Sequence, residues 1–228
     1  MERPRFKLIP GQCWVFVGKK GSGKTYVAIQ MAGLYKRLRP TPFSILVSPN
    51  ASGDPTWNEL VAQWRGRRKN PFMNKHFTRL TTDVKEYLEG ICDQQEDSEN
   101  KQPYLIILDD LQSDHTINQT SILNPVKRMV DSSRHYQTTL MMIYQGVSKI
   151  LPTMIVNADV IVSKKLSGVE SERFRKMFLE DYTKEEFRRV RRQAFIEDYD
   201  NLVVDRSNLL HLRLWRNFSI PIKVKEET

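Results

Sequence analysis

The chain lacks any apolar run long enough to cross a membrane, and it holds only two cysteines. A transmembrane helix needs about 20 consecutive apolar residues, whereas the longest runs here are of the kind seen in residues 140–144. Cys13 and Cys92 are too few to form a zinc site by themselves or a framework of disulfides. The sequence therefore predicts no direct insertion into a membrane, and we interpret both cysteines as reduced packing residues.

Acidic residues are fewer than basic ones. The 228 residues include 36 Lys and Arg against 27 Asp and Glu, which gives a formal net charge of +9 at pH 7. Such an excess favours a polyanionic partner, with nucleic acid as the leading candidate. Because 39% of the residues are apolar and 28% are charged, the composition is that of a folded protein with a sizeable core. The length predicts a single domain over residues 1–228.

Short apolar runs alternate with segments of helical spacing along most of the chain. Such runs are typical of strands buried between helices, and they cover residues 13–17, 43–47, 104–108, 139–144 and 159–163. Helical spacing follows the first run from Val27 to Tyr35. The alternation predicts an α/β fold in which a mainly parallel sheet is flanked by helices.

Residues 55–100 interrupt this alternation, and we interpret them as a helical and basic insertion. A helix is expected to begin at Pro55, and a second one is expected before residue 93. The basic segment 65–79 predicts a loop between these two helices, and the polar segment 93–102 predicts a solvated connection to the next strand.

Residues 166–228 are expected to form a C-terminal extension of the same domain. Thr183 and Glu186 have the spacing of a capping box, which predicts the start of a helix. Apolar residues then alternate at 210, 212 and 214 and again at 220, 222 and 224. This alternation predicts an antiparallel hairpin or meander that covers one edge of the sheet.

The most specific motif follows the first apolar run. Residues 18–25 match G-x-x-x-x-G-K-[ST] between a predicted strand and a predicted helix. In such a loop the backbone N–H groups surround a triphosphate, the lysine reaches the β and γ phosphates, and the hydroxyl binds Mg²⁺. The motif predicts an ATP and Mg²⁺ site formed by Gly18, Lys19, Lys20, Gly21, Ser22, Gly23, Lys24 and Thr25.

Two carboxylates and an amide end the neighbouring predicted strands. Asp109 closes the run 104–108, where a carboxylate would bind the magnesium ion together with Thr25. Asp110 could polarise the attacking water, or it could simply cap a helix. Gln145 could sense the γ-phosphate or orient that water, and an ordinary loop glutamine fits its spacing equally well.

An arginine precedes the run 139–144. A guanidinium supplied by a neighbouring subunit can stabilise the charge on a transferring phosphoryl group, and Arg134 is placed to serve this purpose. A surface arginine is the alternative that composition alone favours. We interpret His135 as a packing or surface residue, because Asp109 and Asp110 already supply the carboxylates that phosphoryl transfer needs.

These features together resemble one family, the FtsK/HerA group of P-loop motor ATPases, and within it the small genome-packaging ATPases of viruses. The resemblance rests on residues 18–25, on Leu105-Ile106-Ile107-Leu108-Asp109-Asp110, on Ser133-Arg134-His135, and on Ile143-Tyr144-Gln145 followed by Leu151-Pro152. It implies a RecA-like core, an arginine finger at Arg134 that acts in the neighbouring subunit, and a sensor at Gln145. Asp110 departs from the pattern, because cellular members commonly carry Glu there.

The resemblance also implies an oligomeric state, binding partners and a location. Packaging ATPases of tectivirus-type viruses, which have an internal membrane and a double-jelly-roll capsid, are the most similar group. A member would form a homo-oligomeric ring, a hexamer or a pentamer, and would contact double-stranded DNA and the proteins of the capsid or portal vertex. It would be found at the packaging vertex of the virion and in the host cytoplasm.

Two basic clusters are candidates for contacts with DNA phosphates, which would be independent of base sequence. The first spans residues 65–79, with Arg65, Arg67, Arg68 and Lys69 as the candidate residues. The second includes Arg188 and Arg189 on a predicted helix that also carries acidic residues, so a solvated and partly ion-paired face is its alternative.

We therefore expect an ATP-hydrolysing translocase that packages double-stranded viral DNA into a preformed capsid. A helicase or a virion-export motor with the same fold is one alternative. A nucleotide-gated structural component of the virion is another. A small-molecule kinase is disfavoured, because the sequence shows neither an arginine-bearing lid nor a signature of an acceptor site.

Overall fold

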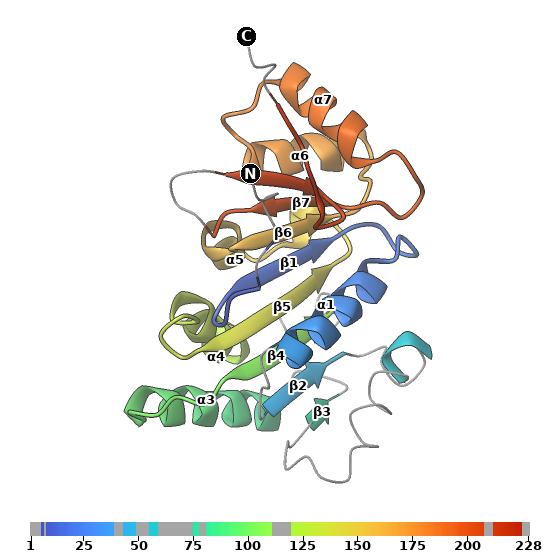
Figure 1. Cartoon of the computed structure of the whole chain (residues 1–228). Helices are drawn as coiled ribbons and strands as arrows, with labels where there is room; N and C mark the ends of the chain where they lie inside the picture. The colour runs from blue at the N-terminus through green and yellow to red at the C-terminus, as the bar shows by residue number, and fades with distance from the viewer. Residues whose placement is uncertain are drawn as a thin grey trace.

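The structure is a computed structural model that describes residues 6, 8–38, 43–48, 55–58, 75–77, 81–110, 120–207 and 212–224. In these residues nine strands form one sheet in the order β3-β2-β4-β5-β1-β6-β7-β8-β9 (Figure 1). The strands are β1 (Cys13–Val17), β2 (Phe43–Val47), β3 (Lys75–Phe77), β4 (Tyr104–Asp109), β5 (Thr138–Tyr144), β6 (Val160–Ser163), β7 (Leu202–Asp205), β8 (Arg213–Arg216) and β9 (Ile220–Pro221).

The sheet is parallel from β3 to β6 and antiparallel from β6 to β9. The α-helices whose two ends are both described are α1 (Lys24–Leu38), α3 (Thr82–Asp97), α4 (Thr120–Asp131), α5 (Pro152–Asn157), α6 (Gly168–Phe178) and α7 (Lys184–Ala194), and Val147–Lys149 form a short 3₁₀ helix. The predicted α/β class, the mainly parallel sheet and the antiparallel C-terminal strands are thus confirmed.

The central strands are buried because both faces of the sheet are covered. Successive side chains of a strand point to opposite faces. In β1 the side chains of Trp14 and Phe16 pack with α1, whereas Cys13, Val15 and Val17 pack with the core beneath the other helices. Figure 1 shows α1 on one face of the sheet and α3 to α7 on the other. This continuous burial explains why each strand reads as an unbroken apolar run.

Cys13 and Cys92 are free and buried, as the sequence analysis expects. Burial raises the pKa of the Cys92 thiol to about 11 and that of Cys13 to about 12. Both thiols therefore stay protonated at neutral pH and pack as small apolar groups. Among the helices that the structure describes, none is both long and apolar enough to cross a membrane.

Two expectations for the region 55–100 are wrong. Lys75–Phe77 form β3 beside β2, although the whole of 65–79 is predicted to be a loop. The segment 93–102 is not a solvated connection throughout, because α3 continues to Asp97. Gln95 is buried in that last turn, and its amide donates to the carbonyls of Gln102 and Tyr136. A polar side chain whose hydrogen bonds are satisfied can be buried, which composition alone does not reveal.

The C-terminal extension follows the prediction closely. Thr183 and Glu186 form the capping box of α7, in which the Thr183 N–H donates to Glu186 Oε2 at 2.8 Å. The strand β7 lies between α7 and the hairpin, and it is a strand that the pattern of the sequence did not predict. The helix expected at Pro55 is present over residues 55–58, and its continuation lies outside the described residues.

Candidate nucleotide site

The phosphate loop joins β1 to α1 at the carboxyl edge of the parallel sheet. Its start is fixed by a hydrogen bond from the Gly18 N–H to the Tyr144 carbonyl at 3.2 Å. Gly21 and Gly23 have φ angles of 75° and 79°, which residues with a Cβ seldom adopt. Because the first turn of α1 holds no acidic residue, the positive end of this helix is left for an anion.

Two observations show that the loop fits a phosphate. The Ser22 hydroxyl is buried and has no hydrogen-bond partner among the described residues, as expected of a group that would donate to a ligand. The Lys24 side chain lies on the inner side of the loop, with its Nζ 3.5 Å from the carbonyl oxygen of Lys19. Burial lowers the pKa of Lys24, while the charges of Asp109 and Asp110 oppose that shift. Both acids therefore act on the lysine of the loop.

Asp109 is the last residue of β4, and two residues from other parts of the chain form hydrogen bonds with its side chain. Its Oδ2 atom accepts hydrogen bonds from the indole N–H of Trp57 at 2.7 Å and from the Ser48 hydroxyl at 3.2 Å. Burial raises the pKa of this carboxyl to about 6, and both hydrogen bonds oppose the shift. The Thr25 hydroxyl and the Asp109 carboxylate supply oxygen ligands of the kind that Mg²⁺ prefers. The two residues thus fit the predicted metal role.

Ser48 and Trp57 are parts of this site that were not predicted from the sequence. Ser48 follows β2 directly, so its place at the carboxyl edge could have been predicted from strand order. Trp57 fits a helical stripe in the sequence and carries no other signal. Its contact with a residue 52 positions away depends on how the insertion folds back, and no local pattern indicates that.

Asp110 and Gln145 meet at the ends of neighbouring strands. The Gln145 Nε2 atom donates to Oδ2 of Asp110 at 2.6 Å. Asp110 has a φ angle of 50°, a left-handed conformation that turns the chain sharply after β4. Such backbone strain recurs at functional sites. The residues that would form a helix capped by Asp110 begin at 111 and lie outside the described part, so that alternative stays open.

Arg134 lies near the amino end of β5, at the edge of the sheet opposite to the carboxyl edge that carries the phosphate loop. It belongs to the turn 132–137 before β5, and the seven residues of β5 separate it from Gln145, a length of about 20 Å. Its guanidinium forms an ion pair with the buried Asp159 and its side chain is 62% exposed. Arg134 therefore lies far from the phosphate loop of its own chain, and it lines a hollow of about 490 Å³ together with His135 and Arg206.

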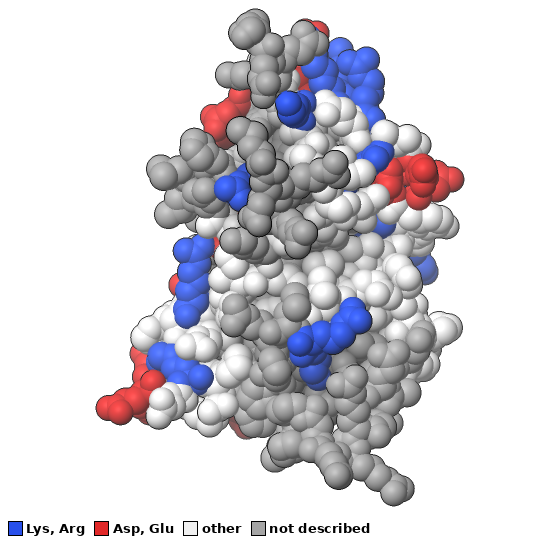
Figure 2. All heavy atoms as spheres, viewed as in Figure 1, with Lys and Arg blue, Asp and Glu red and all other residues white. Residues whose placement is uncertain are grey.

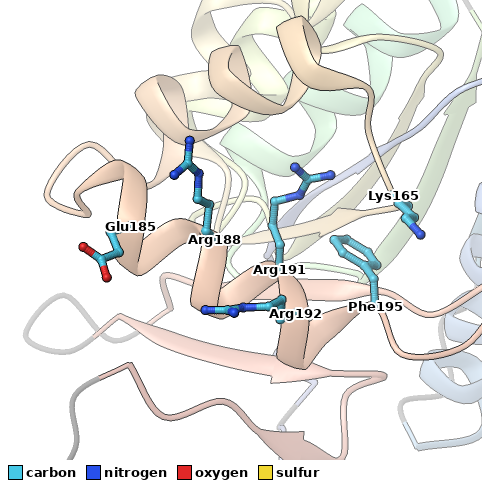
Figure 3. Close-up of a pocket in the computed structure, with 6 residues that line it drawn as sticks. All are labelled: Lys165, Glu185, Arg188, Arg191, Arg192 and Phe195. Atoms are coloured by element: carbon cyan, nitrogen blue, oxygen red, sulfur yellow. The ribbon is translucent and has the colours of Figure 1, made fainter.

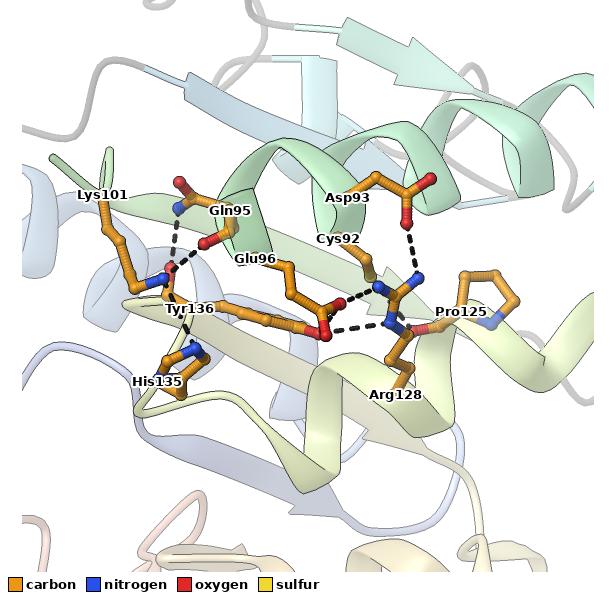
Figure 4. Close-up of polar contacts among 9 residues, drawn as sticks. All are labelled: Cys92, Asp93, Gln95, Glu96, Lys101, Pro125, Arg128, His135 and Tyr136. Carbon is orange, nitrogen blue, oxygen red and sulfur yellow. Dashed lines mark hydrogen bonds and ion pairs between the residues drawn. The ribbon is translucent and has the colours of Figure 1, made fainter. Parts of the chain in front are cut away.

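A polar cluster holds the turn of Arg134 against two helices (Figure 4). Arg128 of α4 forms ion pairs with Asp93 and Glu96 of α3. The Tyr136 hydroxyl donates to the same Glu96 carboxylate at 3.2 Å. Lys101 approaches the exposed imidazole of His135 at 3.4 Å, consistent with a surface histidine. The turn that carries Arg134 is thus fixed from the side of the sheet that holds α3 and α4.

The second basic cluster lies on α7. Figure 2 shows Lys and Arg side chains gathered over this helix, near the top of the molecule. A hollow of about 600 Å³ opens there, and Figure 3 shows the residues that line it, namely Lys165, Glu185, Arg188, Arg191, Arg192 and Phe195. Arg189 lies outside this lining and pairs with Glu185. The candidate residues of the first cluster, Arg65, Arg67, Arg68 and Lys69, fall in residues 59–74, outside the described part of the chain.

Comparisons with known proteins bear on the fold. No model of a known protein family and no curated protein sequence matches the chain. Among solved structures, the genome-packaging NTPase B204 of Sulfolobus turreted icosahedral virus 2, in complex with AMP, superposes with a TM-score of 0.62 at 16% identity, over 91% of this chain and 98% of that one.

Two further solved structures have the same fold. The conjugation coupling protein TcpA of pCW3, with ATPγS, gives a TM-score of 0.58 at 10% identity, over 94% of this chain and 61% of TcpA. EccC of Thermomonospora curvata gives 0.53 at 12% identity, over 95% of this chain and 37% of the EccC chain. At these identities the comparisons confirm a P-loop ATPase fold, and the resemblance drawn from the sequence holds at that level.

Proposed function

We propose that the chain is a motor that hydrolyses ATP to move double-stranded DNA. The proposal is carried by the convergence of Lys24, Asp109, Asp110 and Gln145 on one edge of the sheet, beside a loop that fits a phosphate. The solved structures of B204 and TcpA, which share the fold, contain AMP and ATPγS respectively. Their ligands support an adenine nucleotide here.

The site has a group for each need of phosphoryl transfer to water. A bond forms between the water oxygen and the γ-phosphorus, and the bond from that phosphorus to the β–γ bridging oxygen breaks. Lys24 and the N–H groups of the loop stabilise the charge on the phosphate oxygens. Asp110 accepts a proton of the attacking water, while the Gln145 amide orients the water and the Asp110 carboxylate. A Mg²⁺ ion held by Thr25 and Asp109 would neutralise the β and γ oxygens.

Arg134 would complete the site of a neighbouring copy. An arginine at the opposite edge of the sheet cannot reach the phosphates of its own chain, but a second copy can bring its phosphate loop to that edge. The guanidinium then stabilises the transferring phosphoryl group, so that hydrolysis requires assembly. We infer a homo-oligomeric ring, a hexamer or a pentamer.

The basic hollow on α7 supports a polyanionic substrate. Its lining holds four cationic side chains and one acid, and Arg188 and Arg192 are exposed. Contacts of this kind bind phosphates without reading bases, so affinity should fall steeply with salt. Lys165 lies one residue beyond Lys164, whose stem packs on Gly18. This chain connection between the lining and the segment that contacts the phosphate loop would couple the two ligands. Arg65, Arg67, Arg68 and Lys69 remain a second candidate surface.

The viral neighbour suggests the biological setting. B204 is described as a genome-packaging NTPase, and it matches this chain over nearly the full length of both proteins. We infer that this chain likewise pumps viral DNA into a preformed capsid, and that it docks on capsid or portal-vertex proteins. It would then be found at the packaging vertex of the virion and in the host cytoplasm.

The decisive experiment measures the ATPase rate with and without double-stranded DNA across a salt series, together with the mass of the protein in solution. DNA stimulation that fades with salt, on an oligomer, is the expected result. If a monomer shows no stimulation, procapsids are added. Hydrolysis that stays absent with procapsids would contradict the motor and favour a nucleotide-gated structural component. Strand separation by the isolated protein would favour a helicase.

A further inference from the structure

The loop between α7 and β7 lies against the phosphate loop (Figure 1). A Cβ atom placed on Gly23 would meet Cδ1 of Tyr199 at 3.3 Å, so the tyrosine ring packs on the glycine that precedes Lys24. Tyr199 is nevertheless 72% exposed. An aromatic ring that is exposed to water beside a phosphate-binding loop can accept a flat ligand on its open face.

The position of Tyr199 is imposed by its surroundings. Its φ angle is 68°, a left-handed conformation that is costly for a bulky residue. The carboxylate of Asp200 accepts hydrogen bonds from the N–H groups of Ile196 and Glu197, at 3.1 and 2.9 Å. Asn217, from the turn between β8 and β9, donates to the same carboxylate at 2.5 Å. A strained and exposed aromatic residue on a loop built this rigidly points to a function for the ring.

A buried lysine ties this loop to the phosphate loop. Lys164 is only 3% exposed, and its N–H donates to the Val17 carbonyl at 2.9 Å. Its stem is so close to Gly18 that a Cβ there would lie 2.7 Å from the lysine Cβ. Its Nζ atom donates to the carbonyl oxygen of Tyr199 at 2.5 Å. Burial lowers the pKa of Lys164 to about 8, and Asp200 opposes the shift.

Strand order indicates which end of a nucleotide would reach Tyr199. Asp109 and Gln145 follow β4 and β5, which lie on one side of β1. Lys164 follows β6, on the other side of β1. Because the γ-phosphate must face the catalytic acids, the α-phosphate and the nucleoside extend in the opposite direction, toward β6 and the loop that carries Tyr199.

We propose that Tyr199 forms the nucleoside end of the site and stacks its ring against the base of the bound nucleotide. This inference rests on the proposed binding of ATP. Stacking uses the π-face that every base has, and it does not read hydrogen-bonding edges. The site should therefore bind ADP and GDP similarly and CDP, with its smaller base, more weakly.

The test compares two ligands on two variants. Tyr199→Asn removes the ring and keeps a residue that tolerates a left-handed backbone, whereas Tyr199→Phe keeps the ring as the matched control. Calorimetry measures the Kd of ADP and of inorganic tripolyphosphate, which lacks a base. We expect Tyr199→Asn to weaken ADP binding roughly tenfold, the effect of losing one base–aromatic stack, and to leave tripolyphosphate binding unchanged. Tyr199→Phe should bind both ligands like the wild type.

The outcomes separate this inference from the proposed function. Equal losses for ADP and tripolyphosphate would show that Tyr199 only supports the phosphate loop, and would overturn the stacking role. Unchanged ADP binding by Tyr199→Asn would show that the ring contributes nothing to nucleotide affinity, and tighter ADP binding would show that the ring obstructs the loop; either result would overturn the stacking role. A wild-type protein that binds neither ligand would instead contradict the proposed ATP site.

Discussion

The Nε2 atom of Gln145 lies 2.6 Å from Oδ2 of Asp110, and this hydrogen bond joins the ends of β5 and β4. It orients a carboxylate that already sits on a strained backbone. A γ-phosphate that attracts the Gln145 amide would compete for this bond and free the carboxylate to receive a proton. The pair would thus link the presence of ATP to the position of the proposed base, Asp110.

Asp110→Asn tests the role of the base. Asparagine has nearly the same shape, tolerates the left-handed backbone and can still accept from Gln145, but it cannot take a proton from water. We expect hydrolysis to fall by about 100-fold or more, with the Kd of ATP little changed. Single-turnover hydrolysis and equilibrium binding measure the two effects. Wild-type hydrolysis by this variant would contradict the role of Asp110 as the base, whereas full biological function without hydrolysis would favour a nucleotide-gated component over a motor.

The environment of Asp109 predicts a dependence on pH. Its pKa is about 6, and only the ionised carboxylate binds Mg²⁺, so Mg²⁺-dependent nucleotide binding should weaken as the pH falls through about 6. Trp57→Phe and Ser48→Ala each remove a hydrogen bond that lowers this pKa, and each should move the midpoint to a higher pH. Titration of MgATP affinity between about pH 5 and 8 measures it. A midpoint that neither variant moves would contradict this account of Asp109.

Linkage fixes the sign of the corresponding effect on stability. The folded chain binds the Asp109 proton more tightly than the unfolded chain does, because folding raises the pKa of this carboxyl from its ordinary value of 3.8 to about 6. The free energy of unfolding without Mg²⁺ therefore gains a contribution as the pH falls through about 6, and this gain is complete below the unfolded pKa. Asp109→Asn should remove that pH-dependent part, as denaturant unfolding at several pH values would show.

Subunit mixing tests the proposed position of Arg134. Arg134→Ala should abolish hydrolysis and spare ATP binding, and Lys24→Ala should lose binding. A mixture of the two should regain part of the activity, because interfaces between an intact phosphate loop and an intact arginine form again. Arg134→Lys serves as the matched control, since it keeps a charge beside Asp159 without the guanidinium fork. No rescue in the mixture would exclude an arginine that acts on a neighbouring site.

The salt dependence of DNA affinity tests whether the hollow on α7 binds DNA. Arg188→Gln and Arg192→Gln should each weaken DNA binding equally for unrelated sequences, and each should reduce the slope of log affinity against log salt by about 1 if its arginine neutralises one phosphate. Arg213→Gln, at an exposed position on β8 outside the hollow, is the matched control. Basal ATPase activity without DNA should not change. If only the control variant weakens binding, DNA lies elsewhere.

The part of the site that depends on local spacing could be predicted from the sequence. Residues 18–25 form a contiguous motif, and Asp109 and Gln145 each end an apolar run, so strand order alone brings them to one edge. Trp57, Lys164 and Tyr199 could not be predicted, because each acquires its role from an interaction between segments far apart in the chain. Tyr199, for example, reaches Gly23 because β7 pairs antiparallel with β6, which places the start of β7 beside the end of β6.

Most of the fold could also be predicted from local sequence patterns. The two elements that were predicted wrongly depend on contacts between distant segments. Strands buried on both faces give continuous apolar runs that stand out from the sequence. β3 and the last turn of α3 do not, since the first is a short strand in a basic segment and the second carries Gln95, a polar residue buried by its hydrogen bonds. The residues with which these two segments form hydrogen bonds decide their structure, and the composition of the segments does not indicate those partners.

The placement of Arg134 and the phosphate loop at opposite edges of one sheet restricts the symmetry of any assembly that joins them. A two-fold dimer buries the same patch on both copies, so it would join these edges only if one patch held both of them. Opposite edges are instead joined head-to-tail, with every copy donating at one end and receiving at the other. Such an assembly has a direction, and if it stops before closing it leaves one arginine and one phosphate loop unmatched. Only a closed circle has as many complete sites as it has members.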